Sequence, residues 1–329
     1  MIEHVIGEER AFAQCHAATI AAIPGGVLVA WFGGTREGHE DVAIWGATRT
    51  AAGWGPARRL AKVADVAHWN PVLVGLDASG RSLALHFKVG RSIRRWRTFV
   101  QVSRDGDETW DAPRPVEPDD DTARGPVRSR PIRLRSGDWL AGASTERWRR
   151  WDAFFDRSAN GIDGWQRTRD VDLDRRRFAG KGLIQPTLWE SRPGRVHALF
   201  RSTDGRVHRS DSEDDGRTWS PAYPTNLPNN NSGLDVVRSE DGVLALACNP
   251  VPGNWAARTP LSILFSTDEG ATWPERVDVE TEPGEFSYPA LVAHEGALHL
   301  AYTWNRRRIA YARVTPPTGG GPDPAEPLS

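Results

Sequence analysis

Short apolar runs alternate with turn-forming residues along the chain. The runs Val27–Phe32, Leu83–Phe87 and Leu244–Cys248 contain five or six residues and lie close to glycine, proline or asparagine. Runs of this length fit strands, whereas a helix needs about ten or more residues with a 3.6-residue period. The pattern therefore predicts an all-β fold.

A motif that ends in tryptophan repeats at a nearly constant interval. Its tryptophans are Trp54, Trp110, Trp165, Trp219 and Trp273, with spacings of 56, 55, 54 and 54 residues. The clearest copies are Ser212–Trp219 and Ser266–Trp273, and Asp107 replaces the glycine in Ser103–Trp110. The aspartate can accept hydrogen bonds from backbone N–H groups of a turn, and glycine supplies positive φ, so each copy is typical of a tight hairpin. A regular period of this size predicts a propeller or a solenoid of about six units.

A second repeat, out of phase with the first, places one polar or aromatic residue at the start of each innermost strand. These residues are His16, Asn70, Arg130, Gln185, Ser232 or Asp235, and Tyr288, at steps of 54, 60, 55, about 50 and about 53 residues. The second strand of each unit returns to the same end, where it carries Arg36 and Glu37, Lys88, Glu146, Arg201, Asn249, or Trp304 with Asn305. We expect all of them to surround one mouth of a central channel.

Only ring closure removes the open edges of such units. We therefore expect a six-bladed β-propeller of four-stranded antiparallel blades over residues 1–314. Because no sixth tryptophan motif follows Trp273, residues 2–13 are predicted to supply the outer strand of the last blade. The Pro/Gly-rich residues 315–329 are predicted to be a disordered tail.

Composition narrows the functional classes. The formal net charge of -1 gives no electrostatic reason to expect a nucleic-acid or membrane partner. Cys15 and Cys248 are the only cysteines, so neither a disulfide framework nor a metal or other cofactor is predicted. The N-terminal residues lack the basic and apolar regions of a signal peptide, which favours a cytoplasmic location. The sequence makes no prediction of oligomeric state.

The tryptophan motifs match the Asp-box repeat, and over roughly residues 10 to 312 the ring resembles the six-bladed sialidase (neuraminidase) superfamily. The resemblance implies that Arg201 and Arg258 grip a substrate carboxylate and that Tyr288, in Phe286-Ser-Tyr-Pro-Ala-Leu291, is the nucleophile. It also implies that the catalytic acid lies within residues 33–41, where Asp41 and Glu37 are the two candidates. The sequence departs from the family at two positions, since His16 replaces the first arginine and Gln185 replaces the glutamate base.

Further polar residues complete the predicted pocket. They are Arg130, Asn70, His68, Lys88, Arg36, Glu146, Asn231 and Asp235, with Glu146 or Glu190 as substitutes for the missing base. A pocket of cations, histidines, tyrosine and carboxylates suits an acidic sugar, so a sialidase-like exo-glycosidase is the first interpretation. A polysaccharide lyase is the alternative, because β-elimination needs a cation on the uronate carboxylate and a Tyr or His to remove a proton. A non-catalytic sugar-binding module is the third.

Overall fold

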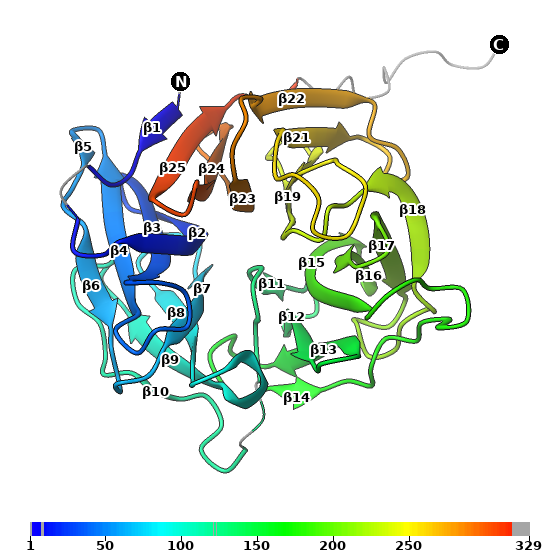
Figure 1. The fold of residues 1–329 in the computed structure, drawn as a ribbon, viewed down its shortest axis with the longest axis horizontal. Coiled ribbons are helices and arrows are strands. Elements are labelled where there is room, and N and C mark those ends of the chain that lie inside the picture. The colour runs from blue at the N-terminus through cyan, green and yellow to red at the C-terminus, as the bar shows by residue number, and fades with distance from the viewer. Residues whose placement is uncertain (1, 8–9, 121, 123, 318–329) are drawn as a thin grey trace.

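Six antiparallel sheets form a ring around a central axis (Figure 1). The computed structural model describes residues 2–7, 10–120, 122 and 124–317. In order from the axis outward, blade one contains β2 (Gln14–Ile23), β3 (Gly26–Gly34), β4 (Ala43–Thr50) and β5 (Gly53–Trp54), and β6 (Arg58–Ala61) also pairs with β4. Blade two contains β7 (His68–Gly75), β8 (Leu83–Val89), β9 (Arg97–Ser103) and β10 (Arg114–Pro115), with a short 3-10 helix η1 (Ile93–Arg95) before β9.

The other four blades repeat this order. Blade three contains β11 (Ile132–Arg133), β12 (Trp139–Glu146), β13 (Trp151–Ser158) and β14 (Gln166–Arg167). Blade four contains β15 (Leu183–Arg192), β16 (Arg195–Ser202), β17 (Arg206–Ser212) and β18 (Tyr223–Pro228). Blade five contains β19 (Asp235–Arg238), β20 (Leu244–Cys248), β21 (Leu261–Ser266) and β22 (Glu275–Glu280). Blade six contains β23 (Phe286–His294), β24 (Ala297–Trp304), β25 (Arg308–Val314) and β1 (Ile2–His4). The predicted all-β, six-bladed propeller is confirmed.

The N-terminal strand closes the ring. Strand β1 pairs antiparallel with β25, with Ile2 opposite Ala312 and His4 opposite Ala310. Figure 1 shows this strand lying beside β25 in the last blade. Main-chain hydrogen bonds thus join an N-terminal strand to a C-terminal strand within one blade. The predicted closure of the ring is confirmed. Most of the predicted disordered tail, residues 318–329, lies outside the described residues.

The tryptophan motifs are side-chain-locked hairpins. Asp214 accepts hydrogen bonds from the backbone N–H of Thr218 at 2.8 Å and from its hydroxyl at 2.6 Å. Asp268 and Thr272 repeat both bonds at the same distances. The indole N–H of Trp219 bonds the carbonyl of Gly216 at 3.0 Å and its ring stacks on Phe155 of the preceding blade. Each motif therefore fixes a turn and also joins two blades.

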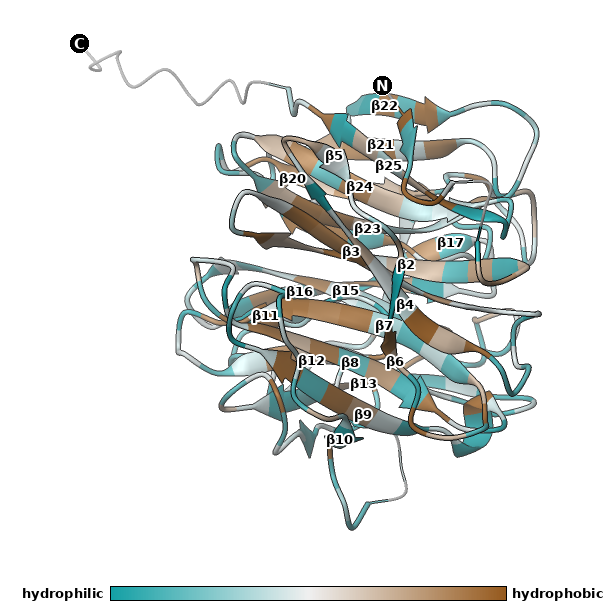
Figure 2. Ribbon diagram, turned by 90° about the vertical axis from the view of Figure 1, so that its left-hand side faces the viewer, coloured by the Kyte–Doolittle hydropathy of each residue, from teal (hydrophilic) through white to brown (hydrophobic). Residues whose placement is uncertain are grey.

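Apolar side chains pack between neighbouring blades. In one cluster Leu28 and Phe32 of blade one meet Leu73, Leu85 and Phe87 of blade two, all buried. Figure 2 shows apolar colour concentrated on the strands and polar colour on the loops. Since each blade buries its faces only against its neighbours, the ring is the stable unit. Within the described part of the chain no helix is long and apolar enough to cross a membrane.

His86 provides a test of this packing by pH. Its ring is fully buried, its Nε2 lies 3.0 Å from the Ile162 carbonyl, and burial lowers its pKa to about 4. The unfolded chain binds this proton below about pH 6.5, whereas the folded chain does not until about pH 4, so acid favours unfolding. His86→Gln keeps a donor for Ile162 but removes the titration. Between pH 7 and 4.5, denaturant titrations should show wild type losing about 2–3 kcal/mol of unfolding free energy relative to the variant. Parallel pH curves for the two proteins would refute this assignment.

Candidate functional site

The innermost strands bend at one end of the axis. Ala17, Asn70, Gln185 and Tyr288 have φ values of 57°, 38°, 52° and 54°, and strand register shifts at each of these positions. Non-glycine residues at positive φ are uncommon, and such bulges re-aim side chains. Asn231, just before β19, has φ of 57°. The second repeat recognised in the sequence therefore marks bulges that turn side chains toward the axis.

Tyr288 is surrounded by arginines. The Nη1 of Arg201 donates a hydrogen bond to the Tyr288 hydroxyl at 2.5 Å. The guanidinium carbons of Arg128, Arg201 and Arg258 lie 5.1, 5.6 and 5.7 Å from the centre of its ring. Tyr288 keeps 9% of its surface exposed. Three cations around one ring favour the binding of an anion beside it.

Arg201 is held rigidly but carries no ion pair. Its Nε donates to Asn231 Oδ1 at 2.7 Å, and Nη1 also donates to Gln185 Oε1 at 3.1 Å. Both partners are neutral amides that orient the guanidinium without cancelling its charge. Among the described residues no carboxylate forms a salt bridge with Arg201. A buried arginine that neutral side chains orient is well suited to bind a carboxylate.

Arg258 and Arg306 share one carboxylate. Arg258 Nη1 lies 2.7 Å from Glu285 Oε1, and Arg306 Nε lies 2.9 Å from the same oxygen. Arg306 also pairs with Glu37, which the sequence proposed as an acid. Glu37 therefore lies in the site as the partner of an arginine.

His16 packs against the nucleophile candidate. The centres of the His16 and Tyr288 rings are 4.2 Å apart, and His16 Nδ1 lies 2.9 Å from the Thr303 hydroxyl. Burial holds the pKa of His16 well below its usual value, and the charges of Arg306, Arg258, Arg128 and Arg201 lower it further. The imidazole is therefore neutral at neutral pH and retains a proton-accepting nitrogen.

Glu146 lies beside Gln185, the residue that replaces the glutamate base of the family. It is half-buried at the end of β12, and Gln185 hydrogen-bonds its side chain. Burial raises the pKa of Glu146, an effect that Arg201 opposes and Glu37 reinforces. It also borders a cleft of about 590 Å³ between blades two and three. By contrast Glu190 accepts backbone N–H bonds from Arg135 and Gly194, so it caps a distant hairpin.

Asp41 forms hydrogen bonds within its own loop. Both oxygens lie 3.0 Å from the backbone nitrogen of Thr35, and Oδ1 lies 2.8 Å from His39 Nδ1. Burial opposes ionisation of Asp41, but the bonds from Thr35 and His39 outweigh it and hold its pKa below the usual value. A carboxylate kept ionised in this way is a poor proton donor. Arg36, in the same loop, is exposed.

Arg130 does not join the Tyr288 cluster, and Arg128 takes its place. Arg128 donates to the Pro289 carbonyl at 2.6 Å, whereas Arg130 donates to the Leu291 carbonyl, two residues further along β23. Pro289 and Leu291 are two residues apart on β23, a separation of about 7 Å along a strand. Arg130 thus faces the channel at a deeper level than predicted.

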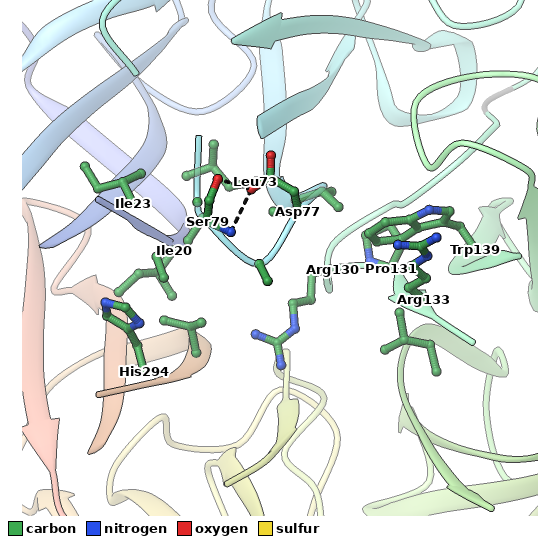
Figure 3. A pocket seen from close by; sticks show the side chains of 18 residues that line it. Ile20, Ile23, Leu73, Asp77, Ser79, Arg130, Pro131, Arg133, Trp139 and His294 are labelled. Atoms are coloured by element: carbon green, nitrogen blue, oxygen red, sulfur yellow. Dashed lines mark hydrogen bonds between the residues drawn. The ribbon is translucent and has the colours of Figure 1, made fainter. Parts of the chain in front are cut away.

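The deeper level is a separate pocket of about 390 Å³ near the far ends of the inner strands. Figure 3 shows the Arg130 guanidinium reaching into it, with His294 and Ile20 on one side and Asp77 bonded to Ser79 on another. His294 is six residues beyond Tyr288 on β23, about 20 Å away along the strand. The prediction that all anchoring residues meet at one end is therefore wrong for Arg130.

Other predicted pocket residues serve the fold. His68 bonds the Val63 nitrogen and the Val66 carbonyl, and stacks on Phe87. Lys88 is buried on the Thr98 hydroxyl at 2.6 Å, and burial lowers its pKa to about 7. Asn70 donates to the Val127 carbonyl and joins blades two and three.

Asp235 lies behind the site and accepts bonds from Thr187 of blade four and the Leu291 nitrogen of blade six. It therefore ties three blades together at the axis. The structure thus brings together Tyr288, His16, Arg201, Arg258, Gln185, Asn231, Glu146 and Glu37. It leaves His68, Lys88, Arg130 and Arg36 outside this set.

Sequence reasoning missed two arginines. Arg128 lies two residues before Arg130. The step of 60 residues from Asn70 to Arg130 is longer than the other steps of the repeat, and it was the signal in the sequence that an earlier residue could face the site. Arg306 lies in the β24–β25 turn, where nothing in the local sequence distinguishes it. Two buried nitrogens of Arg128, Nε and Nη1, have no hydrogen-bond partner in the described chain. Buried donors of this kind are costly unless a ligand satisfies them.

Among the described residues, no group of three or more His, Cys, Asp or Glu side chains is arranged to hold a metal ion. Both cysteines are free and buried.

Comparison with known proteins agrees with the propeller. Residues 25–300 match the family described as BNR repeat-like domain. The fold is similar to that of the Hadza microbial sialidase Hz136, with a TM-score of 0.79 and 16% identity, covering 96% of this chain and 68% of that one. A protein of unknown function from Dyadobacter fermentans gives 0.76 and 14%, covering 95% and 99%. The NanB sialidase from Streptococcus pneumoniae gives 0.75 and 10%, covering 94% and 69%. A sequence search of curated proteins returned no match.

Proposed function

The chain belongs to the BNR repeat-like domain family, and from that premise we propose that it is a sialidase-like exo-glycosidase that acts on an acidic sugar. One observation carries the proposal: Arg201, which is buried and has no salt bridge with any described residue, donates a hydrogen bond to the hydroxyl of Tyr288. The same cation can bind a sugar carboxylate and stabilise charge on the attacking oxygen. Arg128 supplies further donors for that carboxylate, since two of its buried nitrogens have no hydrogen-bond partner among the described residues.

The bound carboxylate also makes His16 a stronger base. Four arginines lower the pKa of His16, so an anion placed among them cancels part of that effect and makes the imidazole more basic. His16 then accepts the phenol proton as the Tyr288 oxygen attacks the anomeric carbon. The bond to the leaving oxygen breaks and Glu146 donates its proton there. Water then attacks the anomeric carbon and gives one proton to Glu146, while the bond to Tyr288 breaks and His16 returns the phenol proton to the Tyr288 oxygen.

Glu146 suits the acid role because burial raises its pKa and because it borders an open cleft where a leaving group can lie. Its amide partner Gln185 also bonds Arg201, so the acid and the carboxylate-binding arginine are held in one network. In this assignment Gln185 orients two catalytic groups instead of acting as a base.

The proposal is tested by incubating the protein with sialosides, rhamnosyl-glucuronides and uronate oligomers while both reducing ends and unsaturated-uronate absorbance are followed. We expect new reducing ends without new absorbance, for an acidic glycoside and not for its neutral analogue. Growth of both signals would favour the lyase. The lyase is also compatible with the neutral His16 beside Tyr288 and with the lack of a carboxylate at Gln185. Binding without either product would favour a sugar-binding module.

Glu146→Gln should lower turnover by about 10²–10⁴-fold on a natural glycoside but only slightly on an aryl glycoside, whose leaving group needs no proton. The alkaline limb of kcat/KM should disappear, because an acid is lost as the pH rises through its pKa. Glu190→Gln is the matched control, since Glu190 caps a distant hairpin. Equal losses on both substrates would remove Glu146 from proton donation.

A further inference from the structure

Two arginine-tryptophan segments have no role in the proposed chemistry. Residues 91–97 read Arg-Ser-Ile-Arg-Arg-Trp-Arg, and residues 147–151 read Arg-Trp-Arg-Arg-Trp. The first contains η1 and lies between β8 and β9, and the second joins β12 to β13. Both segments therefore emerge at the ends of neighbouring blades, on the side of the ring that carries Glu146.

The structure brings the two segments together around one exposed tryptophan. Trp148 keeps 71% of its surface exposed, the highest value among the exposed large apolar side chains of the described chain. The guanidinium of Arg94 lies 5.8 Å from its ring, and the Lys181 ammonium of blade four lies 5.7 Å from it. Lys181 is also 5.5 Å from the ring of Trp151, which in turn lies 5.9 Å from Arg201. A continuous row of aromatic and cationic groups thus leads from the surface to the site.

A cleft of about 590 Å³ adjoins this row at Arg94, which lines the cleft and also lies on the ring of Trp148. Arg94, Trp96, Arg147 and Arg167 line it, and Glu146 forms part of the same wall. The group proposed to protonate the leaving oxygen therefore opens directly into the cleft. The leaving group of a sugar bound at Tyr288 therefore starts at Glu146, and one that is several sugar units long extends along the cleft toward Arg94.

Part of the positive charge of this surface is not balanced by ion pairs, although Arg124 of the cleft wall pairs with Asp120. Arg94, Arg147 and Lys181 form no ion pair with any described residue, whereas Arg150 and Arg167 pair with Asp152 and Asp170. The whole chain carries a formal net charge of -1, so these cations are a local concentration and not a general property of the protein. Clustered unpaired cations attract and concentrate anions.

We propose that this cleft binds the leaving-group side of a polyanionic glycan, so that the substrate is an acidic oligosaccharide and not a single acidic sugar on a neutral carrier. The inference rests on the proposed function, because Glu146 defines which side is the leaving group. The flat face of Trp148 suits the apolar face of a sugar ring, and its flanking cations suit carboxylate or sulfate groups on the same ring. Continuity with Glu146 favours a glycan over a nucleic acid.

The probe is a short oligogalacturonate, compared with a neutral galacto-oligosaccharide and single-stranded DNA. The variants are Trp148→Ala and Arg94→Gln, with Arg104→Gln as the control, because Arg104 is an exposed arginine in the hairpin at the opposite end of β9. Calorimetry should show oligogalacturonate binding that weakens by about tenfold in each cleft variant and not in the control. Raising the salt concentration should weaken it further. The KM for an acidic oligosaccharide should rise while kcat/KM for an acidic aryl glycoside stays within about twofold.

Failure of the cleft and failure of the catalytic proposal give different results. If the protein hydrolyses no acidic glycoside but binds oligogalacturonate through Trp148 and Arg94, the cleft stands and the enzymatic proposal falls. Equal effects of the cleft variants on the oligosaccharide and the aryl glycoside would overturn the cleft. So would the absence of oligogalacturonate binding, or DNA binding of equal strength with the same sensitivity to the variants.

Discussion

Tyr288→Phe is expected to lower turnover of the acidic glycoside by about 10²–10⁴-fold while leaving the fold intact. The variant removes only the hydroxyl that accepts the Arg201 hydrogen bond, and it keeps the ring that packs against His16. Without the oxygen there is no attacking atom and no proton for His16 to accept. Steady-state kinetics and a denaturant titration of the same preparation measure the two effects separately.

His16→Ala should cause a loss in the same range, and the double variant should be little worse than either single one, because residues that act as a unit are not additive. Thr303→Val is an informative partner, since it removes the hydroxyl that holds His16 Nδ1 but leaves the imidazole in place. Wild-type turnover in both single variants would return the search for catalytic groups to Asp41 and Glu37.

Arg201→Ala is expected to reduce kcat/KM for the acidic glycoside by about 10–100-fold, which corresponds to the loss of one hydrogen bond to a charged group of about 1.5–3 kcal/mol. Arg201→Lys should recover little, because an ammonium cannot reach Tyr288, Gln185 and Asn231 together with the geometry of a planar guanidinium. The loss should be selective for the charged ligand, so binding of a matched neutral sugar should change little.

Arg258→Ala should have a smaller effect, since Glu285 already offsets its charge. Equal losses for charged and neutral ligands would instead show that Arg201 supports the mouth of the ring. In that structural role Arg201 would act through its bonds to Asn231 of the β18–β19 connection and Gln185 of β15. The comparison of the two ligands distinguishes them.

The repeats made the architecture predictable from the sequence. Trp219 and Trp273 end motifs whose aspartate, glycine and tryptophan each form a bond or contact within about eight residues, so local chemistry dictates each hairpin. The missing sixth motif predicted that residues 2–13 would close the ring, and β1 pairs with β25 as expected. Tyr288, His16, Arg201 and Gln185 were likewise found by their place in a periodic pattern.

What the sequence could not decide is the depth of a side chain in the channel and the partner that it meets there. Arg128 and Arg130 are the same residue type and lie two positions apart, and only their contacts with β23 show which one reaches Tyr288. The roles proposed for Glu146, Arg306 and Trp148 depend on contacts with residues of other blades. The sequence by itself determined the ring, because its bonds are local and repeated. Only the tertiary structure decided the site, because its contacts join residues up to 287 positions apart, such as His16 and Thr303, through the geometry of closure.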